Sequence, residues 1–195
     1  MAAFRVIALA GSLREASISR GLAEAAARVA PSGIEVDVFD SLGAVPYYNE
    51  DLDTPHPVPV EVIALRSAII AADAALMITP EYNGSLPGVL KNAIDWASRP
   101  HGRGALSGKG TAIIGLSTGG RGGARALEEL RVIVGIAGGV VVEGACLSVG
   151  RAGHLFGARR TAMDDEVEGK IAHSLQALAD AAGPHADRKA RNAHL

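Results

Sequence analysis

The sequence predicts one α/β domain, built as a parallel β-sheet with helices on both faces. Strand patterns alternate with helical patterns along the chain, five strands in all, and strands separated by helices pair in parallel. A chain of 195 residues fits one domain and buries roughly 70% of its unfolded surface, enough for a self-sufficient core. Hydrophobic residues make up 48% but aromatic residues only 4%, so we expect a core of Ala, Val, Ile and Leu.

The first half of the chain supplies three of the strands. Continuous apolar runs predict the first and third as buried strands, and alternating apolar and acidic residues predict the second as half-buried. Ala-rich and apolar-periodic stretches predict the helices, and a stretch rich in Pro and acidic residues predicts an irregular excursion. In chain order we expect a strand at 4–10, a helix at 22–29, a strand at 34–39, the excursion at 40–60, a helix at 61–72 and a strand at 74–79.

The second half continues this alternation. Apolar residues at helical spacing follow Pro87, and a glycine-rich loop then leads into the fourth strand. No repeat or linker divides the chain, so we expect a single domain over 1–185 and a polar tail over 186–195. The elements expected here are a helix at 86–98, a loop at 99–110, a strand at 111–116, a helix at 124–136, a strand at 140–149 and a helix at 162–182.

The composition argues against several classes of partner. A net charge of −2 argues against nucleic acid or an anionic membrane surface. No segment reaches the ~18 apolar residues of a membrane helix, and Arg5 interrupts the apolar stretch that a signal peptide would need. The one cysteine, Cys146, cannot form an internal disulfide, and its apolar surroundings favour a buried structural thiol. We therefore expect a cytoplasmic protein.

Polar loops follow three of the predicted strands. We call them the first loop (residues 11–19), the second loop (80–85) and the third loop (117–123). Ligands of open α/β sheets bind at the carboxyl ends of the strands, which lie at one edge, so we expect one shared ligand site. Four glycines in the third loop let its backbone approach a ligand closely.

The first loop carries the chemistry of a phosphate site. Ser12, Ser17 and Ser19 offer hydroxyl groups, and Arg14 offers a guanidinium. Backbone N–H groups at the start of the next helix add further donors. The dinucleotide fingerprint G-x-G-x-x-G is absent from this loop. The alternative is simpler, a serine helix cap next to a surface arginine.

The second loop and the helix after it resemble a known family. Residues 80–99, P-E-Y-N-G-S-L-P-G-V-L-K-N-A-I-D-W-A-S-R, are similar to the central motif of the NAD(P)H-dependent FMN reductases, which include quinone, azo-dye and chromate reductases. The first loop resembles the phosphate loop of that family, G-S-L-R-x-x-S-x-N, but has Ser19 in place of the Asn. The resemblance implies a flavodoxin-like, doubly wound, five-stranded sheet of order 2-1-3-4-5.

The resemblance also implies FMN as the cofactor and NADPH or NADH as the co-substrate. A flavin has a flat ring with a pyrimidine edge of alternating donors and acceptors, which loop backbone can recognise. We expect Ser85 to cap the helix after the second loop. The implied cofactor-binding residues are Ser12, Arg14, Ser17, Ile18 and Ser19 in the first loop, Pro80, Glu81, Tyr82 and Asn83 bordering the isoalloxazine ring, and Ser117, Thr118, Gly119 and Gly120, also at the ring.

The implied activity passes hydride from the nicotinamide to flavin N5 and then to a small acceptor, a quinone, free flavin, azo compound or metal oxyanion. The flavin carries this chemistry, so we expect no catalytic acid or base. The six histidines show no metal-ligand spacing, so we expect no metal. Family members form dimers and tetramers, which implies a homodimer or homotetramer. Residues 48–52, Y-N-E-D-L, also resemble the family and either cover the sheet edge near a subunit contact or form only a loop.

Two other functions stay open. A flavodoxin-type electron carrier would shuttle single electrons between partners, although such carriers are expected to be strongly acidic. Residues 115–119 fit G-x-S-x-G, the nucleophile elbow of α/β-hydrolases, and Asp164 or Asp165 and His173 follow Ser117 in the hydrolase order. Against a hydrolase, His173 falls inside a predicted helix and no H-G-G oxyanion motif is present.

Overall fold

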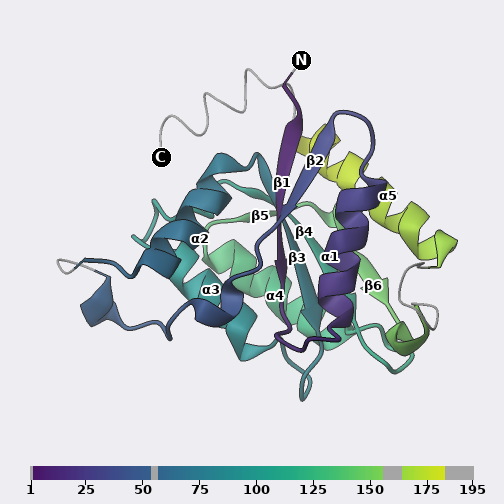
Figure 1. Ribbon diagram of the computed structural model, residues 1–195, viewed down its shortest axis with the longest axis horizontal. Coiled ribbons are helices and arrows are strands. Elements are labelled where there is room, and N and C mark those ends of the chain that lie inside the picture. Colours follow the sequence, from purple (N-terminus) through teal and green to yellow (C-terminus); the bar gives the residue numbers. More distant parts are fainter. Residues whose placement is uncertain (1, 54–56, 156–163, 183–195) are drawn as a thin grey trace.

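The computed structural model describes residues 2–53, 57–155 and 164–182, which form a six-stranded parallel sheet with helices on both faces (Figure 1). The strand order is β2-β1-β3-β4-β5, with β6 also paired to β4. This confirms the flavodoxin-like order and adds a sixth strand. The strands are β1 (Phe4–Ala10), β2 (Ile34–Val38), β3 (Ala74–Pro80), β4 (Gly110–Leu116), β5 (Val140–Val141) and β6 (Leu147–Val149).

The expectation of one continuous strand over 140–149 is wrong. β5 pairs with the start of β4 and β6 pairs with its end. A 3₁₀ turn, η3 (Glu143–Ala145), separates the two short strands. The apolar residues around it suggested a single strand, but Glu143 and Gly144 lie within the run, and both residue types are disfavoured in strands.

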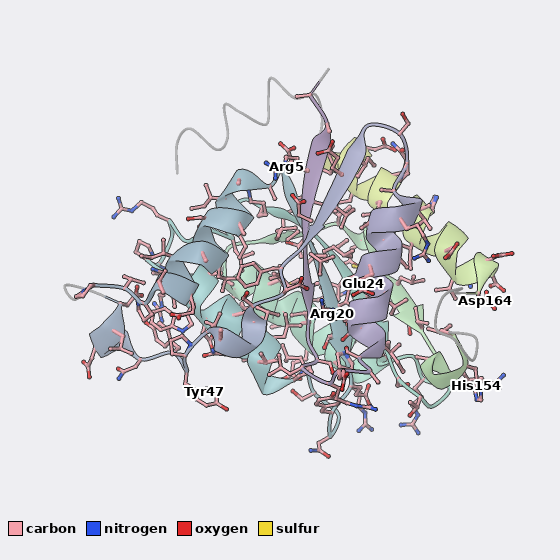
Figure 2. All side chains as sticks on the ribbon, in the orientation of Figure 1. Arg5, Arg20, Glu24, Tyr47, His154 and Asp164 are labelled. Atoms are coloured by element: carbon pink, nitrogen blue, oxygen red, sulfur yellow. The ribbon has the colours of Figure 1, made fainter. Side chains whose placement is uncertain are left out.

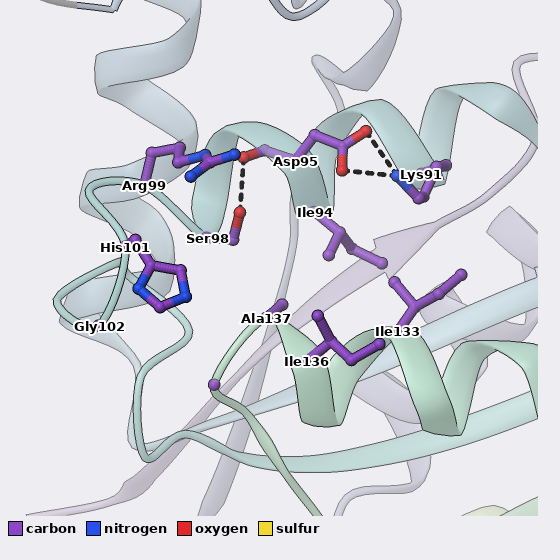
Figure 3. A pocket seen from close by; sticks show the side chains of 11 residues that line it. Lys91, Ile94, Asp95, Ser98, Arg99, His101, Gly102, Ile133, Ile136 and Ala137 are labelled. Carbon is purple, nitrogen blue, oxygen red and sulfur yellow. Dashed lines mark hydrogen bonds and ion pairs between the residues drawn. The ribbon is translucent and has the colours of Figure 1, made fainter.

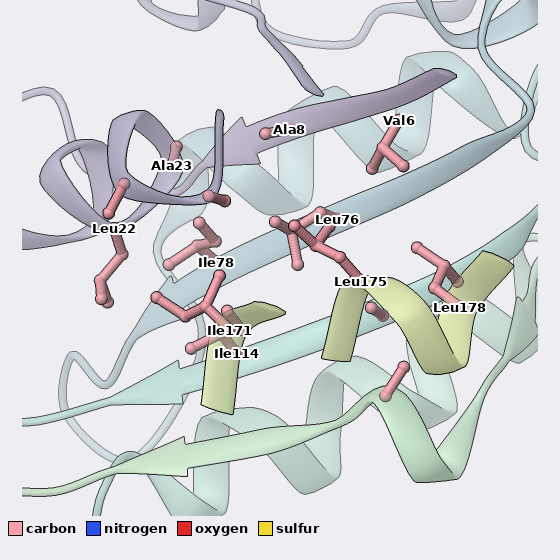
Figure 4. Packing of buried hydrophobic residues seen from close by; sticks show 14 of the residues in the cluster. Val6, Ala8, Leu22, Ala23, Leu76, Ile78, Ile114, Ile171, Leu175 and Leu178 are labelled. Atoms are coloured by element: carbon pink, nitrogen blue, oxygen red, sulfur yellow. The ribbon is translucent and has the colours of Figure 1, made fainter. Parts of the chain in front are cut away.

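Two helices cover one face of the sheet and three cover the other (Figure 1). Leu22 and Leu175 belong to one hydrophobic core with Leu76 of β3 (Figure 4). Trp96 belongs to the second core with Met77, the next residue of β3. Because successive strand residues point to opposite faces, β3 is buried on both sides. The helices are α1 (Ile18–Val29) and α5 (Asp165–Ala182) on the first face, and α2 (Val60–Ala71), α3 (Gly88–Ala97) and α4 (Ala124–Ile136) on the second.

Two helices begin differently from the prediction. Helix α1 begins at Ile18, earlier than expected, because Ser17 caps it: the Ser17 hydroxyl accepts the Arg20 N–H at 3.1 Å. The serine cap considered for this loop is therefore present. The expectation that Ser85 caps α3 is wrong, because Pro87 occupies that position without a side-chain cap.

Helix α3 anchors the excursion that follows β2. The Asn92 side chain accepts the Tyr48 N–H at 2.8 Å and donates to the Pro46 carbonyl at 2.9 Å. The Trp96 indole N–H donates to the same carbonyl at 2.8 Å, and its ring meets Tyr48 edge-on with centroids 4.9 Å apart. The motif residues Asn92 and Trp96 therefore position this segment.

The remaining elements are short. Turns η1 (Leu42–Ala44) and η2 (Glu50–Leu52) lie in the excursion, and η4 (Ala152–His154) follows β6. The predicted tail at 186–195 lies outside the described residues, as do residues 162–163 of the predicted last helix. Of the helices described, none has the length and apolar character needed to cross a membrane.

Candidate functional site

The three loops meet at the carboxyl edge of the sheet. They follow β1, β3 and β4, which are neighbours in the strand order. Ser12 Oγ of the first loop lies 3.2 Å from Tyr82 Oη of the second. Glu81 Oε2 of the second loop accepts the N–H of Arg125, just past the third loop, at 3.1 Å. The structure thus assembles the three predicted loops into one region.

Two of the serines in the first loop are already engaged. Ser17 and Ser19 are buried, and their hydroxyl oxygens lie 2.9 Å apart. The backbone N–H groups of Ile18 and Ser19 belong to the first turn of α1 and meet no acceptor among the described residues. Open donors in this loop are therefore backbone N–H groups at a helix start, whereas the half-buried Ser12 hydroxyl is already in contact with Tyr82 Oη.

Two arginines near the first loop differ in their partners. Arg20 bonds Glu24 at 3.0 Å and Asp40 at 3.1 Å; Figure 2 shows Arg20 and Glu24 on α1. Arg14 is exposed and forms no ion pair with any described carboxylate. Arg14 is therefore an exposed cation without a described carboxylate partner at the first loop.

The second loop is a tight two-residue turn. Tyr82 and Ser85 pair as an antiparallel bridge, with N–H···O distances of 2.9 and 3.0 Å. Asn83 and Gly84 between them have φ values of 53° and 79°. Positive φ at both central residues marks a type I′ turn, for which Asn-Gly is a favoured pair. Ser85 is used in this turn, which explains why it does not cap α3.

The turn leaves few backbone donors in the second loop. Pro80 has no N–H, the Glu81 N–H donates to the Leu116 carbonyl at 3.1 Å, and the Tyr82 N–H is used in the turn. Among the residues expected to border a ring, Asn83 keeps an N–H with no acceptor in the described part of the chain. The Tyr82 side chain remains 44% exposed beside it.

The third loop is held by residues that sequence reasoning missed. The Ser117 N–H donates to the Val149 carbonyl at 3.2 Å, and the Ser117 carbonyl accepts the Ala152 N–H at 2.9 Å. The Arg151 N–H donates to the Gly119 carbonyl at 2.9 Å. In the sequence, Gly150 directly after the last strand was the signal for this contact. The structure shows why a glycine stands there: a Cβ on Gly150 would lie 2.8 Å from the carbonyl oxygen of Gly120 in the third loop.

The outer face of the third loop is exposed backbone. The N–H groups of Thr118, Gly119, Gly120 and Arg121 meet no acceptor among the described residues, and all four residues are exposed. The Ser117 hydroxyl turns back and donates to the Gly119 carbonyl at 3.0 Å. This loop therefore presents the largest set of free donors at the edge.

Positive charge gathers around these loops. Arg14, Arg121, Arg125 and Arg151 border them, and none forms an ion pair with a carboxylate in the described ranges. The chain as a whole carries a net charge of −2, so this edge differs from the average surface. An edge with unpaired guanidinium groups suits a ligand that carries phosphate.

The hydrolase arrangement is not hydrogen-bonded together within the described residues. No described histidine bonds the Ser117 hydroxyl. His173 lies on α5, where it borders a cavity with Cys146 and Lys170. Cys146 is half-buried, not fully buried as expected; its thiol donates to the Val142 carbonyl at 3.6 Å, and partial burial raises the pKa of this thiol. In the described ranges no cluster of His, Cys, Asp and Glu could hold a metal.

Cavity size does not single out the three loops. A cavity of about 310 Å³ lies beside the first loop and is lined in part by Ser12 and Arg14. A cavity of about 370 Å³ lies at the carboxyl ends of α3 and α4, where Ile94, Ile133 and Ile136 line it (Figure 3). Helix α3 runs away from the three loops, so this second cavity is remote from them. The free donors and cations, rather than volume, identify the candidate site.

The fold and the three loops define a class: flavodoxin-like α/β proteins with a ligand site at the carboxyl edge of the sheet. The chain matches the family model described as NADPH-dependent FMN reductase over residues 4–154. It belongs to this family and is an oxidoreductase.

Relatives of known name support this assignment. The chain is 46% identical over 129 residues to 2-hydroxy-1,4-benzoquinone reductase of a Burkholderia species, covering 66% of this chain and 69% of the relative. It is 39% identical over 174 residues to an NAD(P)H-dependent FMN reductase of Pseudomonas aeruginosa, covering 89% and 92%. The solved structure of FerB, a flavoenzyme NAD(P)H:(acceptor) oxidoreductase from Paracoccus denitrificans, matches with a TM-score of 0.79 at 33% identity, covering 90% of this chain and 95% of that one.

Proposed function

We propose that this chain binds FMN at the three loops and uses NADPH or NADH to reduce a small acceptor, with quinones as the preferred class. The observation that carries the proposal is the set of free N–H groups at Thr118–Arg121 on the same edge as the unpaired Arg14. Such an edge offers hydrogen bonds to a ring at one end and charge to a phosphate at the other. The name of the Burkholderia relative supports a quinone acceptor.

The first loop fits the phosphate end of FMN. The Ser12 hydroxyl, the Arg14 guanidinium and the N–H groups of Ile18 and Ser19 are donors of the kind that a phosphate dianion requires. Ser17 and Ser19 contribute indirectly. The buried Ser17 hydroxyl caps α1 and is bonded to the Ser19 hydroxyl, which fixes the first turn of the helix and its N–H groups. With a single phosphate loop, FMN fits better than FAD.

The second and third loops fit the ring end. The N–H groups of Thr118, Gly119 and Gly120 are exposed and meet no described acceptor, and the Asn83 N–H in the second loop is likewise free among the described residues. Pro80, Glu81 and Tyr82 form the base of the turn that would border the ring. Bound FMN would supply the hydride chemistry between nicotinamide and acceptor.

The chain's own part in catalysis is binding and orientation. Backbone donors aimed by hydrogen-bonded loops hold a ligand in one position without reorganising during the reaction. None of the side chains in the three loops needs to move a proton, so we assign no catalytic acid or base.

The wider assignments rest on the same family membership. We propose that the enzyme is a homodimer or homotetramer and that residues 1–185 form its single domain. We also propose that it works in the cytoplasm, where cysteines are kept reduced.

Turnover of NADPH and NADH by purified, FMN-loaded protein tests the proposal. We expect each assay to consume reduced nicotinamide when a benzoquinone is present and to depend on FMN. An electron carrier would hold FMN without oxidising either nucleotide. A hydrolase would hydrolyse model esters through Ser117 whether or not FMN is present.

A further inference from the structure

Helix α4 begins without a cap from its own sequence. Its N-cap residue is Gly123, which has no side chain, and no acidic residue lies in its first turn. Helices normally satisfy the free N–H groups of their first turn with a side-chain oxygen at this position. The position is closed to such residues here, because a Cβ on Gly123 would lie 2.6 Å from the Leu116 nitrogen, and its φ is 70°.

The cap is supplied from another loop. Glu81 Oε2 accepts the N–H of Arg125, the second residue of α4, at 3.1 Å. A carboxylate at this position also interacts favourably with the positive end of the helix dipole. Glu81 therefore replaces the cap that Gly123 cannot provide.

Glu81 also holds the other end of the third loop. Its backbone N–H donates to the carbonyl of Leu116, the last residue before that loop, at 3.1 Å. Leu116 and Arg125 bracket the third loop, so one residue bonds the chain on both sides of it. Between these points lie the free N–H groups of Thr118–Arg121.

We propose that the Glu81 side chain has a positioning role: its carboxylate, without itself contacting the flavin, clamps the start of α4 and thereby aims the third-loop N–H groups, while the Glu81 backbone borders the ring. The inference rests on the proposed function, since it assumes that FMN uses those N–H groups. It assigns to Glu81 a role that acts through α4.

Binding of FMN to apo-protein, followed by flavin fluorescence, tests the clamp. Glu81→Ala removes the bond that holds the start of α4 beside the third loop, so it should weaken FMN about tenfold or more. Glu81→Gln keeps an oxygen that can accept the Arg125 N–H and should stay within about threefold of wild type. Amide exchange at the hydrogen-bonded N–H groups of Ala124, Arg125 and Leu127 in apo-protein should speed up in Glu81→Ala and stay near wild type in Glu81→Gln.

Asp164 provides a matched control. Its carboxylate also caps a helix, but from the position directly before α5: Asp164 Oδ1 accepts the Glu166 N–H at 2.9 Å. Figure 2 shows Asp164 at the start of α5, and it makes no bond to the three loops in the described part of the chain. Asp164→Ala should lower the melting temperature and leave FMN affinity unchanged. This control separates the general effect of losing a helix cap from the specific effect of losing the contact between Glu81 and α4.

The outcomes are distinguishable. If wild-type protein does not bind FMN, the proposed function fails. If wild type binds and Glu81→Ala binds equally well, the clamp is wrong. Equal losses in Glu81→Ala and Glu81→Gln would point to a direct role of the charge and would also overturn the clamp. If Glu81→Ala does not fold, Glu81→Asp takes its place, because its shorter side chain should lose the bond to Arg125 and most of the affinity.

Discussion

Tyr82 Oη lies 3.2 Å from Ser12 Oγ, so two hydroxyl groups 70 residues apart in sequence join the first and second loops. The Tyr82 backbone is fixed at the same time by its two bonds to Ser85. The turn of the second loop is therefore held directly against the loop that we assign to phosphate.

Replacing this tyrosine tests the connection between the two loops. Tyr82→Phe removes the hydroxyl and keeps the ring, so it should lose one hydrogen bond worth about 0.5–1.5 kcal/mol. We expect FMN affinity to fall by a few-fold to about tenfold. Titration of apo-protein with FMN measures this loss, and an affinity equal to that of wild type would show that the contact does not help to form the site.

Arg14 should carry the charge interaction with phosphate. Arg14→Ala should weaken FMN about ten- to a hundredfold, because a charge-assisted hydrogen bond contributes about 1.5–3 kcal/mol. Arg20→Ala is the matched control, since Arg20 is already paired with Glu24 and Asp40. Equal FMN dissociation constants for Arg14→Ala and wild type would remove Arg14 from the site.

Ser117 should act as a ligand-binding residue and not as a nucleophile. Its hydroxyl donates to the Gly119 carbonyl, so Ser117→Ala should reduce FMN affinity by about tenfold or less and leave an active reductase. Treatment with a fluorophosphonate followed by mass spectrometry checks the competing function. Stoichiometric labelling of Ser117, with ester hydrolysis lost in Ser117→Ala, would favour the hydrolase.

Two glycines near α4 should respond in opposite directions to alanine. Gly123 has a φ of 70° and a Cβ there would strike the Leu116 backbone, so Gly123→Ala should lower the free energy of unfolding by about 2–3 kcal/mol. Gly135 lies inside α4, and a Cβ added there would have no neighbour within 4 Å. Gly135→Ala should therefore raise the free energy of unfolding by about 0.5–1 kcal/mol. Urea unfolding of both variants measures the difference, and two changes of the same sign would contradict this account.

The buried Lys109 should make stability depend on pH. Lys109 is 4% exposed, and its ammonium group donates to the Ala72 carbonyl at 2.6 Å. Burial lowers the pKa of Lys109 below its ordinary value of 10.5, although Asp73 opposes the shift. Between the folded and unfolded pKa values the unfolded chain binds more protons, so stability should rise with pH in that window.

The Lys109→Met variant isolates this effect. The free energy of unfolding of wild type, minus that of the variant, should increase as the pH rises towards 10.5 and should be flat well below the window. Urea unfolding at a series of pH values measures it. A difference that stays constant across the window would show that Lys109 is not destabilised by burial.

Much of the fold followed from local patterns. The bounds of β1 and α4 match the prediction, because a continuous apolar run and a helical repeat each extend over the whole element. The strand at 140–149 did not: Glu143 and Gly144 disfavour a continuous strand locally, but the pairing of β6 with the end of β4 joins segments far apart in sequence.

The sequence predicted the three loops of the site but not the hydrogen bonds that join them. Asn83-Gly84 signalled a turn by itself, but the bonds from Glu81 to Arg125 and from Arg151 to Gly119 join segments far apart in sequence. Such contacts appear only once the sheet order places the loops side by side. A serine cap was one interpretation of the first loop, but the burial of Ser17 beside Ser19 was hidden, since burial depends on how α1 packs.

Identification of the flavin released from purified protein tests the central claim most directly. The protein, loaded from an equimolar mixture of FMN and FAD and freed of excess, is heated, and the released flavin is separated by chromatography. We expect FMN as the dominant species in stoichiometric amount. Release of mainly FAD, or of no flavin from folded protein, would contradict it.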